Sequence, residues 1–217
     1  MIIAIDGPAG TGKGTISKLI ADRLGFGNID TGAMYRAVTL KILREEIPLD
    51  DLESIQQLLE NTRLSFNEDE EILLDGENVS HLIRTQEINR VVSQVSAIRF
   101  IREKLVLEQR NFAKGRDIVM EGRDITTVVF PDADLKIYLT ADVEERAQRR
   151  YKEMLDKGVS TTYQEVLEGI KERDYQDMHK EYGALMIAPD AIVVDTTGKS
   201  IEEVYNEVTN YIKREEN

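Results

Sequence analysis

Short apolar segments recur along the chain, and their lengths are typical of buried β-strands. Stretches with apolar residues three and four positions apart, the spacing of amphipathic helices, lie between them. Strands that alternate with helices predict an α/β fold, in which helices cover both faces of a parallel sheet. The five expected strands are Ile2–Ile5, Gly27–Ile29, Asp117–Met120, Asp134–Leu139 and Ala191–Val194.

Polar residues follow directly after these strands. Ligands of open parallel sheets bind beyond the carboxyl ends of the strands, so these residues are expected to share one edge. Several of them are polar or acidic, as a site that binds phosphate together with Mg²⁺ would need. The residues are Asp6, Asp30, Glu121, Thr140 and Asp195.

The alternation is interrupted over residues 63–83. Three apolar groups in this range predict short strands, and Asp75-Gly76 is a typical hairpin turn. We expect a small antiparallel β insert that extends into a helical stretch over 85–113, with a bend or break in its middle. The apolar groups are Leu64 with Phe66, Ile72 with Leu74, and Val79.

Residues 146–173 form a second unusual segment, which is highly charged and contains a loop over 157–162. We expect a helix–loop–helix with little core of its own, as is typical of mobile lids; an ordinary helical hairpin is the alternative. Ser200 and Glu203 have capping-box spacing and predict the start of the last helix. The expected core comprises 1–62, 84–145 and 174–217.

Composition limits the class of protein. The chain has 217 residues, 41% of them hydrophobic, so it can form one sizeable core. It lacks an apolar run of about 18 residues and a basic leader, so we expect a cytoplasmic protein without a membrane span. There is no cysteine, and His81 and His179 are far apart, so neither a disulfide nor a zinc site is expected.

The formal net charge of −13 argues against binding to a nucleic-acid polymer, which normally requires a basic face. It favours a small ligand instead. Since neither a heptad repeat nor an apolar edge is evident, we expect a monomer. The arginines that stand out in so acidic a chain are Arg36, Arg102, Arg123, Arg146, Arg149, Arg150 and Arg173.

A glycine-rich loop lies between the first expected strand and the first expected helix. Its glycines let backbone N–H groups turn toward a phosphate, and the helix N-terminus adds partial positive charge. Lys13 can reach the β- and γ-phosphates of a nucleoside triphosphate. The phosphate loop consists of Gly7, Pro8, Ala9, Gly10, Thr11, Gly12, Lys13, Gly14 and Thr15.

The loop has Gly14 where a serine or threonine usually follows the lysine, and in this it resembles nucleoside monophosphate kinases. An ordered set of further motifs resembles bacterial cytidylate kinases over nearly the whole chain. The matching stretches are IDGPAGTGKGT at 5–15, DTGAMYR at 30–36, IRTQE at 83–87, SQV at 93–95, EGRD at 121–124, VVFPDA at 128–133, IKERD at 170–174 and DTTGKS at 195–200.

This resemblance implies a P-loop three-layer fold with a five-stranded parallel sheet, a small antiparallel β insert and a helical lid. It also implies phosphoryl transfer from ATP to CMP or dCMP, with Mg²⁺. The reaction suits the composition, because the second pKa of a phosphate monoester is about 6. The attacking oxygen is therefore largely deprotonated at neutral pH, and a chain with few histidines needs no general base.

The resemblance also implies roles on the ATP side. The phosphate loop would hold the ATP phosphates, and Mg²⁺ would lie near Thr15, Asp6 and Glu121, with water between. Glu121 stands where the family commonly has aspartate. Arg146 would stack on the adenine, whose edge residues 196–199 would line, and Arg149 and Arg150 would close on the phosphates.

On the acceptor side, the resemblance assigns substrate contacts to Thr31, Tyr35, Arg36, Ser93, Arg102, Arg123, Asp124, Arg173 and Asp177. Arg36, Arg123 and Arg173 would bind the acceptor phosphate and the transferring group. The catalytic set would be Lys13, Arg123, Arg150 and Arg173. Guanidinium groups suit this task because they bind phosphate oxygens bidentately.

The choice of base also has a physical basis. Cytosine carries an amine at the position where uracil carries a carbonyl, and a carboxylate accepts from the amine but repels the carbonyl. Asp124 is the family counterpart of such a carboxylate, with Ser93 and Arg102 beside it. The alternative for Asp124 is a simple ion pair with Arg123.

Three positions depart from the family pattern. Lys180 stands where a last phosphate-binding arginine is usual, and a lysine lacks the guanidinium fork. Thr126 replaces a common glycine, and Ala184 replaces a common proline. We expect altered lid or acceptor details and a slower enzyme.

Two other functions remain open at this point. A kinase for UMP or AMP would share the phosphate loop, although the size of the insert and the set Ser93, Arg102 and Asp124 argue against it. A P-loop switch GTPase would need a guanine-binding Asn-Lys-x-Asp motif, and the sequence contains none.

Overall fold

The computed structural model describes residues 1–156 and 158–215, and residues 157, 216 and 217 lie outside the described part. The chain divides into two compact units. The first unit comprises residues 1–28 and 115–217, and the second comprises 29–114. The division into core, insert and lid that the sequence suggests has different boundaries and stays a prediction.

A five-stranded sheet has the strand order β2-β6-β1-β7-β8. The pairs that β1 makes with β6 and β7, and that β7 makes with β8, are parallel, which confirms the predicted fold class. The strands are β1 (Ile2–Asp6), β2 (Gly27–Asp30), β6 (Ile118–Gly122), β7 (Leu135–Thr140) and β8 (Ile192–Asp195).

Each of these strands extends one or two residues beyond its predicted carboxyl end. Asp6, for example, is the last residue of β1, where it pairs with Gly122 of β6 and Tyr138 of β7. Backbone pairing sets the end of a strand, and a polar side chain does not prevent it. The polar residues that we placed after the strands therefore lie within them.

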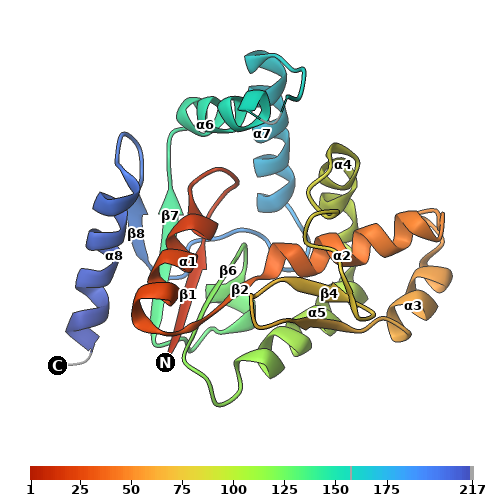
Figure 1. Ribbon diagram of the computed structural model, residues 1–217, viewed down its shortest axis with the longest axis horizontal. Coiled ribbons are helices and arrows are strands. Elements are labelled where there is room, and N and C mark those ends of the chain that lie inside the picture. Colours follow the sequence, from red (N-terminus) through yellow and green to blue (C-terminus); the bar gives the residue numbers. More distant parts are fainter. Residues whose placement is uncertain (157, 216–217) are drawn as a thin grey trace. The chain divides into compact units, whose positions relative to one another are not determined.

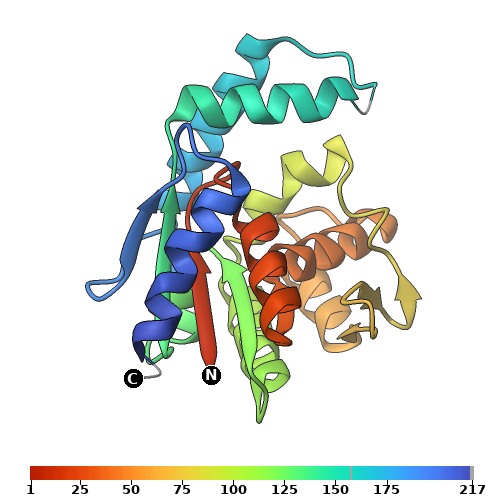
Figure 2. The ribbon, with the colours of Figure 1, turned by 60° about the vertical axis from the view of Figure 1, so that its left-hand side comes forward.

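Two helices of the first unit, α1 (Lys13–Leu24) and α8 (Ile201–Glu215), pack together against the sheet (Figure 2). Alternate residues of β1, including Ile3 and Ile5, point into this apolar cluster. Glu203 donates its backbone N–H to Ser200 Oγ, while Ser200 N donates to the Glu203 carboxylate. This capping box confirms the predicted start of α8.

The predicted helix–loop–helix is present as α6 (Val143–Asp156) and α7 (Tyr163–Met178), which lie side by side (Figure 1). Four residues, Ala147, Val166, Leu167 and Ile170, form a small buried cluster between them. The first residue of the predicted loop, 157, lies outside the described part. A second capping box, between Thr162 and Glu165, begins α7; we did not predict it.

The second unit consists of helices and a small sheet. The helices are α2 (Thr31–Arg44), α3 (Leu52–Glu60), α4 (Gln86–Val95) and α5 (Arg99–Ala113), and the antiparallel strands are β3 (Leu64–Phe66), β4 (Ile72–Leu74) and β5 (Glu77–Asn78). The gap between α4 and α5 confirms the predicted break in the long helical stretch.

The hairpin turn in this unit is the predicted one. Asp75 and Gly76 both have positive φ angles, 52° and 90°, as a tight hairpin turn requires. The third strand was misplaced by one residue, because Val79 is buried just beyond β5 rather than within it. No helix in the described part of the chain is long and apolar enough to cross a membrane.

Candidate active site

The phosphate loop joins β1 to α1 in the first unit. Gly12 precedes α1 with a φ of 88°, in the left-handed region, and supplies no side-chain cap. The first N–H groups of a helix have no partner within the helix. They therefore form, with the positive end of the helix dipole, a site for an anion.

The loop is closely packed at two glycines. A Cβ on Gly7, whose φ is 148°, would lie 2.1 Å from the carbonyl oxygen of Leu139 in β7. A Cβ on Gly14 would lie 2.8 Å from Glu121 Oε1. The absence of side chains at these positions lets the loop rest against β7 and lets the Glu121 carboxylate approach the start of α1.

Lys13 is almost fully buried, with 5% of its surface exposed. Its Nζ donates to the carbonyl oxygen of Pro8, at 2.8 Å, across the phosphate loop. Burial, followed by the charge of Arg123, lowers the pKa of Lys13 to about 7. The ammonium thus lies within the loop where a triphosphate is expected.

Asp6 is fully buried and ties β1 to the chain after β6. Its carboxylate accepts from the backbone N–H groups of Ile125 and Thr126, at 3.0 and 2.7 Å, and from the Thr126 hydroxyl, at 2.7 Å. Burial raises the pKa of Asp6 to about 6, although the Thr126 donors oppose the rise. Both carboxylate oxygens therefore already have donors.

The three residues near the expected Mg²⁺ differ in how available their oxygen atoms are to the ion. Glu121 lies over the start of α1, and Thr15 is exposed in its first turn. Mg²⁺ is usually held by one or two carboxylates with substrate phosphates and water, so Glu121 and Thr15 suit it better than the engaged carboxylate of Asp6. The described residues contain no cluster of three or more His, Asp or Glu side chains that could hold a metal.

Asp124 begins a π-helical turn, η1 (Ile125–Val129), directly after β6. Its carbonyl oxygen accepts from the N–H groups of Val128 and Val129, and only 4% of its surface is exposed. Single π-turns occur frequently at functional sites. Asp124, the predicted base-binding residue, thus lies directly before a turn whose first two backbone N–H groups donate to Asp6.

The buried Asp177 and three partly exposed cations form a cluster near the end of α7. Arg123 Nε donates to Asp177 Oδ2 at 2.8 Å, and Lys180 Nζ donates to Oδ1 at 2.7 Å. Arg173 Nε lies 3.8 Å from Oδ2. Burial favours the neutral form of Asp177, but Arg123, Lys180 and Arg173 together lower its pKa strongly. Three positive charges therefore surround one carboxylate.

Arg146 of α6 lies against the phosphate loop. Its Nη1 donates to the carbonyl oxygen of Ala9, at 3.1 Å, and pairs with Asp174 of α7, at 2.7 Å. A Cβ on Gly10 would lie 3.2 Å from Arg146 Cβ. The guanidinium therefore borders the part of the loop where the nucleoside of ATP is expected.

The other two arginines of α6 differ in their surroundings. Arg149 Nη2 donates to the carbonyl oxygen of Thr196, at 2.7 Å, and also pairs with Glu145. Thr196 in turn donates its hydroxyl to the carbonyl oxygen of Thr11 in the phosphate loop. Arg150 pairs with Glu153 and is partly exposed. The structure thus brings Arg149, but not Arg150, to residues 196–199.

In the second unit, Asp30 lies at the start of α2 and has two arginines, Arg36 and Arg84, as neighbours. It accepts from the N–H of Ala33, at 3.1 Å, and from Arg84 Nη2, at 2.8 Å. A Cβ on Gly32 would lie 2.7 Å from Arg36 Nη1 and 2.9 Å from Asp30 Oδ1. Burial opposes the charge of Asp30, yet Arg36 and Arg84 lower its pKa below the ordinary value.

Arg102, Tyr35 and Ser93 also come together in the second unit. The Arg102 guanidinium, 2% exposed, lies 5.3 Å from the centroid of the Tyr35 ring. Its Nη1 donates to the carbonyl oxygen of Ser96, and Ser96 Oγ donates to that of Ser93. Thr31 lies one helical turn before Tyr35 and is buried. Of the predicted acceptor residues in this unit, Arg102 thus contacts Tyr35 directly and is linked to Ser93 through Ser96.

Sequence reasoning missed the partners that hold these residues. Arg84 belongs to the motif at 83–87, but we assigned it no role, and the pairs Lys180–Asp177 and Arg146–Asp174 were also unforeseen. For Lys180 and Asp177, the available signal was a lysine three residues after an aspartate, a spacing typical of ion pairs on a helix.

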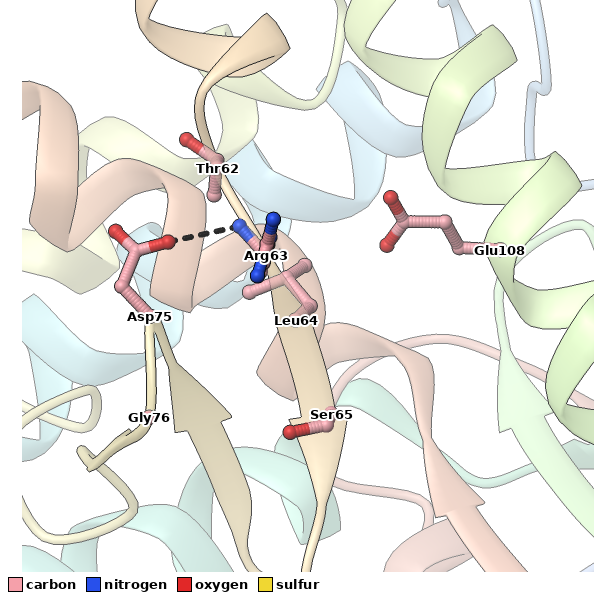
Figure 3. Close-up of a pocket in the computed structure, with 7 residues that line it drawn as sticks. All are labelled: Thr62, Arg63, Leu64, Ser65, Asp75, Gly76 and Glu108. Atoms are coloured by element: carbon pink, nitrogen blue, oxygen red, sulfur yellow. Dashed lines mark hydrogen bonds between the residues drawn. The ribbon is translucent and has the colours of Figure 1, made fainter.

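Two of the hollows in the described part of the chain differ in their relation to the predicted site. The larger, of about 690 Å³, lies in the second unit between β3, the hairpin turn and α5 (Figure 3). None of the predicted site residues lines it. The smaller, of about 400 Å³, is lined in part by Gly14 and Thr15 at the start of α1.

A glycine-rich phosphate loop between β1 and α1 of a parallel sheet, with the buried Lys13 in it, defines the class of P-loop proteins, which bind nucleoside phosphates. A family model described as cytidylate kinase matches residues 3–214. The chain therefore belongs to the cytidylate kinase family.

Curated relatives agree with this family. The chain is 51% identical over 212 residues to the cytidylate kinase of Caldanaerobacter subterraneus subsp. tengcongensis, a match that covers 98% of this chain and 94% of that protein. It is 49% identical over 209 residues to the cytidylate kinase of Caldicellulosiruptor saccharolyticus, covering 95% and 92%. The relatives and this chain thus correspond over nearly their whole lengths.

Proposed function

We propose that this protein transfers the terminal phosphoryl group of ATP to CMP and dCMP, giving ADP and CDP or dCDP. The observation that carries the proposal is the phosphate loop with its buried Lys13, in the same unit as the cluster of Arg123, Arg173 and Lys180 around Asp177. Family membership supports the choice of substrate.

The chemistry requires positioning and charge neutralisation more than proton transfer. The acceptor oxygen is largely deprotonated at neutral pH, because the second pKa of a phosphate monoester is about 6. Negative charge spreads over the transferring phosphoryl group in the transition state. The buried Lys13 and the partly buried Arg123 and Arg173 supply compensating charge where water screens it less than at an open surface.

On the donor side, the loop N–H groups and Lys13 bind the phosphates of ATP. Glu121 and Thr15 would hold Mg²⁺, and Asp6 would act on it through a water molecule. When bound, Mg²⁺ neutralises charge on the phosphate oxygens. Arg146 contacts the adenine, whose edge residues 196–199 line. Arg149 and Arg150 of α6 close on the ATP phosphates when the nucleotide binds.

On the acceptor side, the family resemblance assigns Arg36, Ser93 and Arg102 of the second unit to CMP. Asp124 selects cytosine, because its carboxylate accepts from the exocyclic amine and repels the carbonyl that uracil has in its place. A site built to bond a substrate group rejects an analogue without it by roughly 10⁴–10⁵ at most. Rearranged water is expected to reduce this ratio.

A panel of monophosphates tests both the reaction and the base selection. With ATP and Mg²⁺, we expect coupled ADP release to be fastest with CMP and dCMP, and slow with UMP and AMP. D124A is expected to lower kcat/KM for CMP by about 10² or more, because a buried hydrogen bond to the base is lost. Its ATP affinity should remain within about threefold of the wild type.

The same panel separates the alternatives. Faster turnover of UMP or AMP would assign the protein to another monophosphate kinase. GTP hydrolysis that does not depend on any acceptor would point to a switch GTPase. Unchanged CMP turnover in D124A would remove Asp124 from base selection while leaving the reaction itself in place.

A further inference from the structure

One buried carboxylate, that of Asp6, holds the turn η1 against the end of β1. Oδ1 accepts from the N–H of Ile125 at 3.0 Å, and Oδ2 accepts from the N–H and the hydroxyl of Thr126, both at 2.7 Å. Within the described part of the chain, the carboxylate accepts no other hydrogen bond. Asp6 is 0% exposed, so each donor offsets part of the cost of burying its charge.

Thr126 supplies two of these three donors and is itself buried. Because its N–H and its hydroxyl bond the same oxygen atom, they fix the backbone and the side chain of Thr126 together. Hydrogen bonds to an ionised acceptor are stronger than those between neutral groups. A residue without a hydroxyl, such as the glycine that is common here in the family pattern, would supply only the N–H.

The peptide unit that follows Asp124 is held at both ends. Its carbonyl oxygen accepts from the N–H groups of Val128 and Val129, at 2.8 and 3.1 Å, and its N–H, which is that of Ile125, donates to Asp6. Since a peptide unit is planar and moves as one piece, its orientation helps to set the direction in which the Asp124 side chain leaves the backbone. The position of the Asp6 carboxylate therefore affects where the Asp124 carboxylate lies.

The two carboxylates also act on each other. Burial raises the pKa of Asp6, and the charge of Asp124 adds to the rise, whereas the donors of Thr126 oppose it. Asp6 and Asp124 are thus close enough to repel each other. Without the hydroxyl of Thr126, the charge of Asp6 would be less compensated, and the turn between the two carboxylates would relax away from its present position.

We propose that Thr126 is a positioning residue for the selection of the base: its hydroxyl holds Asp6, and through Asp6 the turn η1, so that the Asp124 carboxylate is directed at the amine of cytosine. The proposal rests on the proposed function, because that function assigns Asp124 to the base. It adds to the selection of the base a residue that acts through hydrogen bonds to another residue.

The test begins with T126V, which keeps the shape of the side chain and the backbone N–H but removes the hydroxyl. We expect kcat/KM for CMP to fall by about tenfold, because a buried carboxylate loses a donor and the turn shifts. The ratio of kcat/KM for CMP to that for UMP should fall by about fivefold. T126S, which restores the hydroxyl, should keep both values within about twofold of the wild type.

A double-mutant cycle with D124A separates positioning of the base-binding residue from a general loss of activity. If Thr126 acts through Asp124, T126V should change the CMP-to-UMP ratio by less than about twofold in the D124A background. A ratio that falls equally in both backgrounds would overturn the proposal. A ratio that T126V leaves unchanged in the otherwise wild-type protein would overturn it as well.

Hydrogen exchange measures the tie itself and requires no activity. The N–H of Ile125, which donates to Asp6 Oδ1, should exchange at least about tenfold faster in T126V than in the wild type, because the carboxylate that holds it is less fixed. T126S should exchange at the wild-type rate. An unchanged rate in T126V would refute the tie, whether or not the protein phosphorylates CMP.

T209V is the matched control. Thr209 is also buried in the first unit, and its hydroxyl donates to the carbonyl oxygen of Tyr205 in α8, at 2.9 Å. Its loss should leave the CMP-to-UMP ratio and the exchange of Ile125 unchanged. Should T126V fail to fold, T126G, which keeps the backbone donor, replaces it in the same cycle. A wild type that does not phosphorylate CMP would refute the proposed function instead.

Discussion

Lys13 and Asp177 are both buried and ionisable, but the neighbouring cations disfavour the charged form of Lys13 and favour that of Asp177. Burial and the nearby Arg123 make the charged form of Lys13 costly, which lowers its pKa to about 7. Asp177 has cations on both oxygens, so its pKa is lowered although burial opposes its charge. The site is thus prepared to receive negative charge near Lys13, and Asp177 stays ionised throughout the neutral range.

The pKa of Lys13 predicts a proton linked to ATP binding. At pH 8 most of the free protein has a neutral Lys13, while bound phosphates favour its charged form, so ATP binding should take up a proton. ATP affinity should therefore fall as pH rises above about 7. Calorimetry at pH 8 in buffers with different ionisation enthalpies measures this uptake.

K13M is the control for this measurement and should show no linked uptake at that site. Proton release, or uptake that persists in K13M, would contradict the assignment. The same pKa makes folding stability rise with pH. Between pH 7 and the ordinary value of 10.5, the unfolded chain binds the proton more tightly than the folded protein does.

At the scale of elements, the phosphate loop depends on how closely β1 and its following loop approach β7. Gly7 has no side chain where a Cβ would collide with the backbone of Leu139. Gly25, which ends α1, also has a left-handed φ, 73°, but a Cβ there would meet nothing within 4 Å. A substitution at Gly25 therefore tests backbone strain alone, whereas one at Gly7 also tests close packing against β7.

We predict that G7A destabilises the protein far more than G25A. G25A should cost only the left-handed strain of about 1–2 kcal/mol. G7A should cost about 3 kcal/mol or more, because the β7 backbone has to move as well, and it should weaken ATP binding. Thermal unfolding with nucleotide titration compares them, and equal losses would contradict the role of close packing.

At the scale of the whole molecule, 41 acidic residues outnumber 28 basic ones, for a formal net charge of −13. Yet several cations that the proposed function uses are buried, with exposed fractions of 2% for Arg102 and 5% for Lys13 and Arg146. Some of the positive charge thus lies at buried positions among the site residues, which suits a small anionic ligand better than a long polyanion.

We predict no measurable affinity for duplex DNA. Fluorescence anisotropy of a labelled duplex at about 50 mM salt, where non-specific binding would be strongest, is the measurement. A fluorescent ATP analogue in the same buffer provides the positive control. Binding of the duplex that weakens steeply with salt would show a basic face that the sequence does not suggest.

Local patterns in the sequence determined a large part of this description. The phosphate loop, the alternation of strands and helices, the Asp75-Gly76 turn and the capping box at Ser200 each depend on residues close together in the chain. Their physical causes are local hydrogen bonds, backbone conformation and the period of apolar positions. They were therefore predictable without the tertiary structure.

Only the tertiary structure decided the partners that buried charges have far away in the chain. The Asp6 carboxylate is held by Thr126, about half the chain away, and Arg123 is held by Asp177. The π-turn after Asp124 and the last residue of each strand likewise follow from packing against distant segments. Such contacts join residues that are far apart in the sequence. The periodicity of apolar positions predicts local elements, and it does not indicate which distant residues will meet.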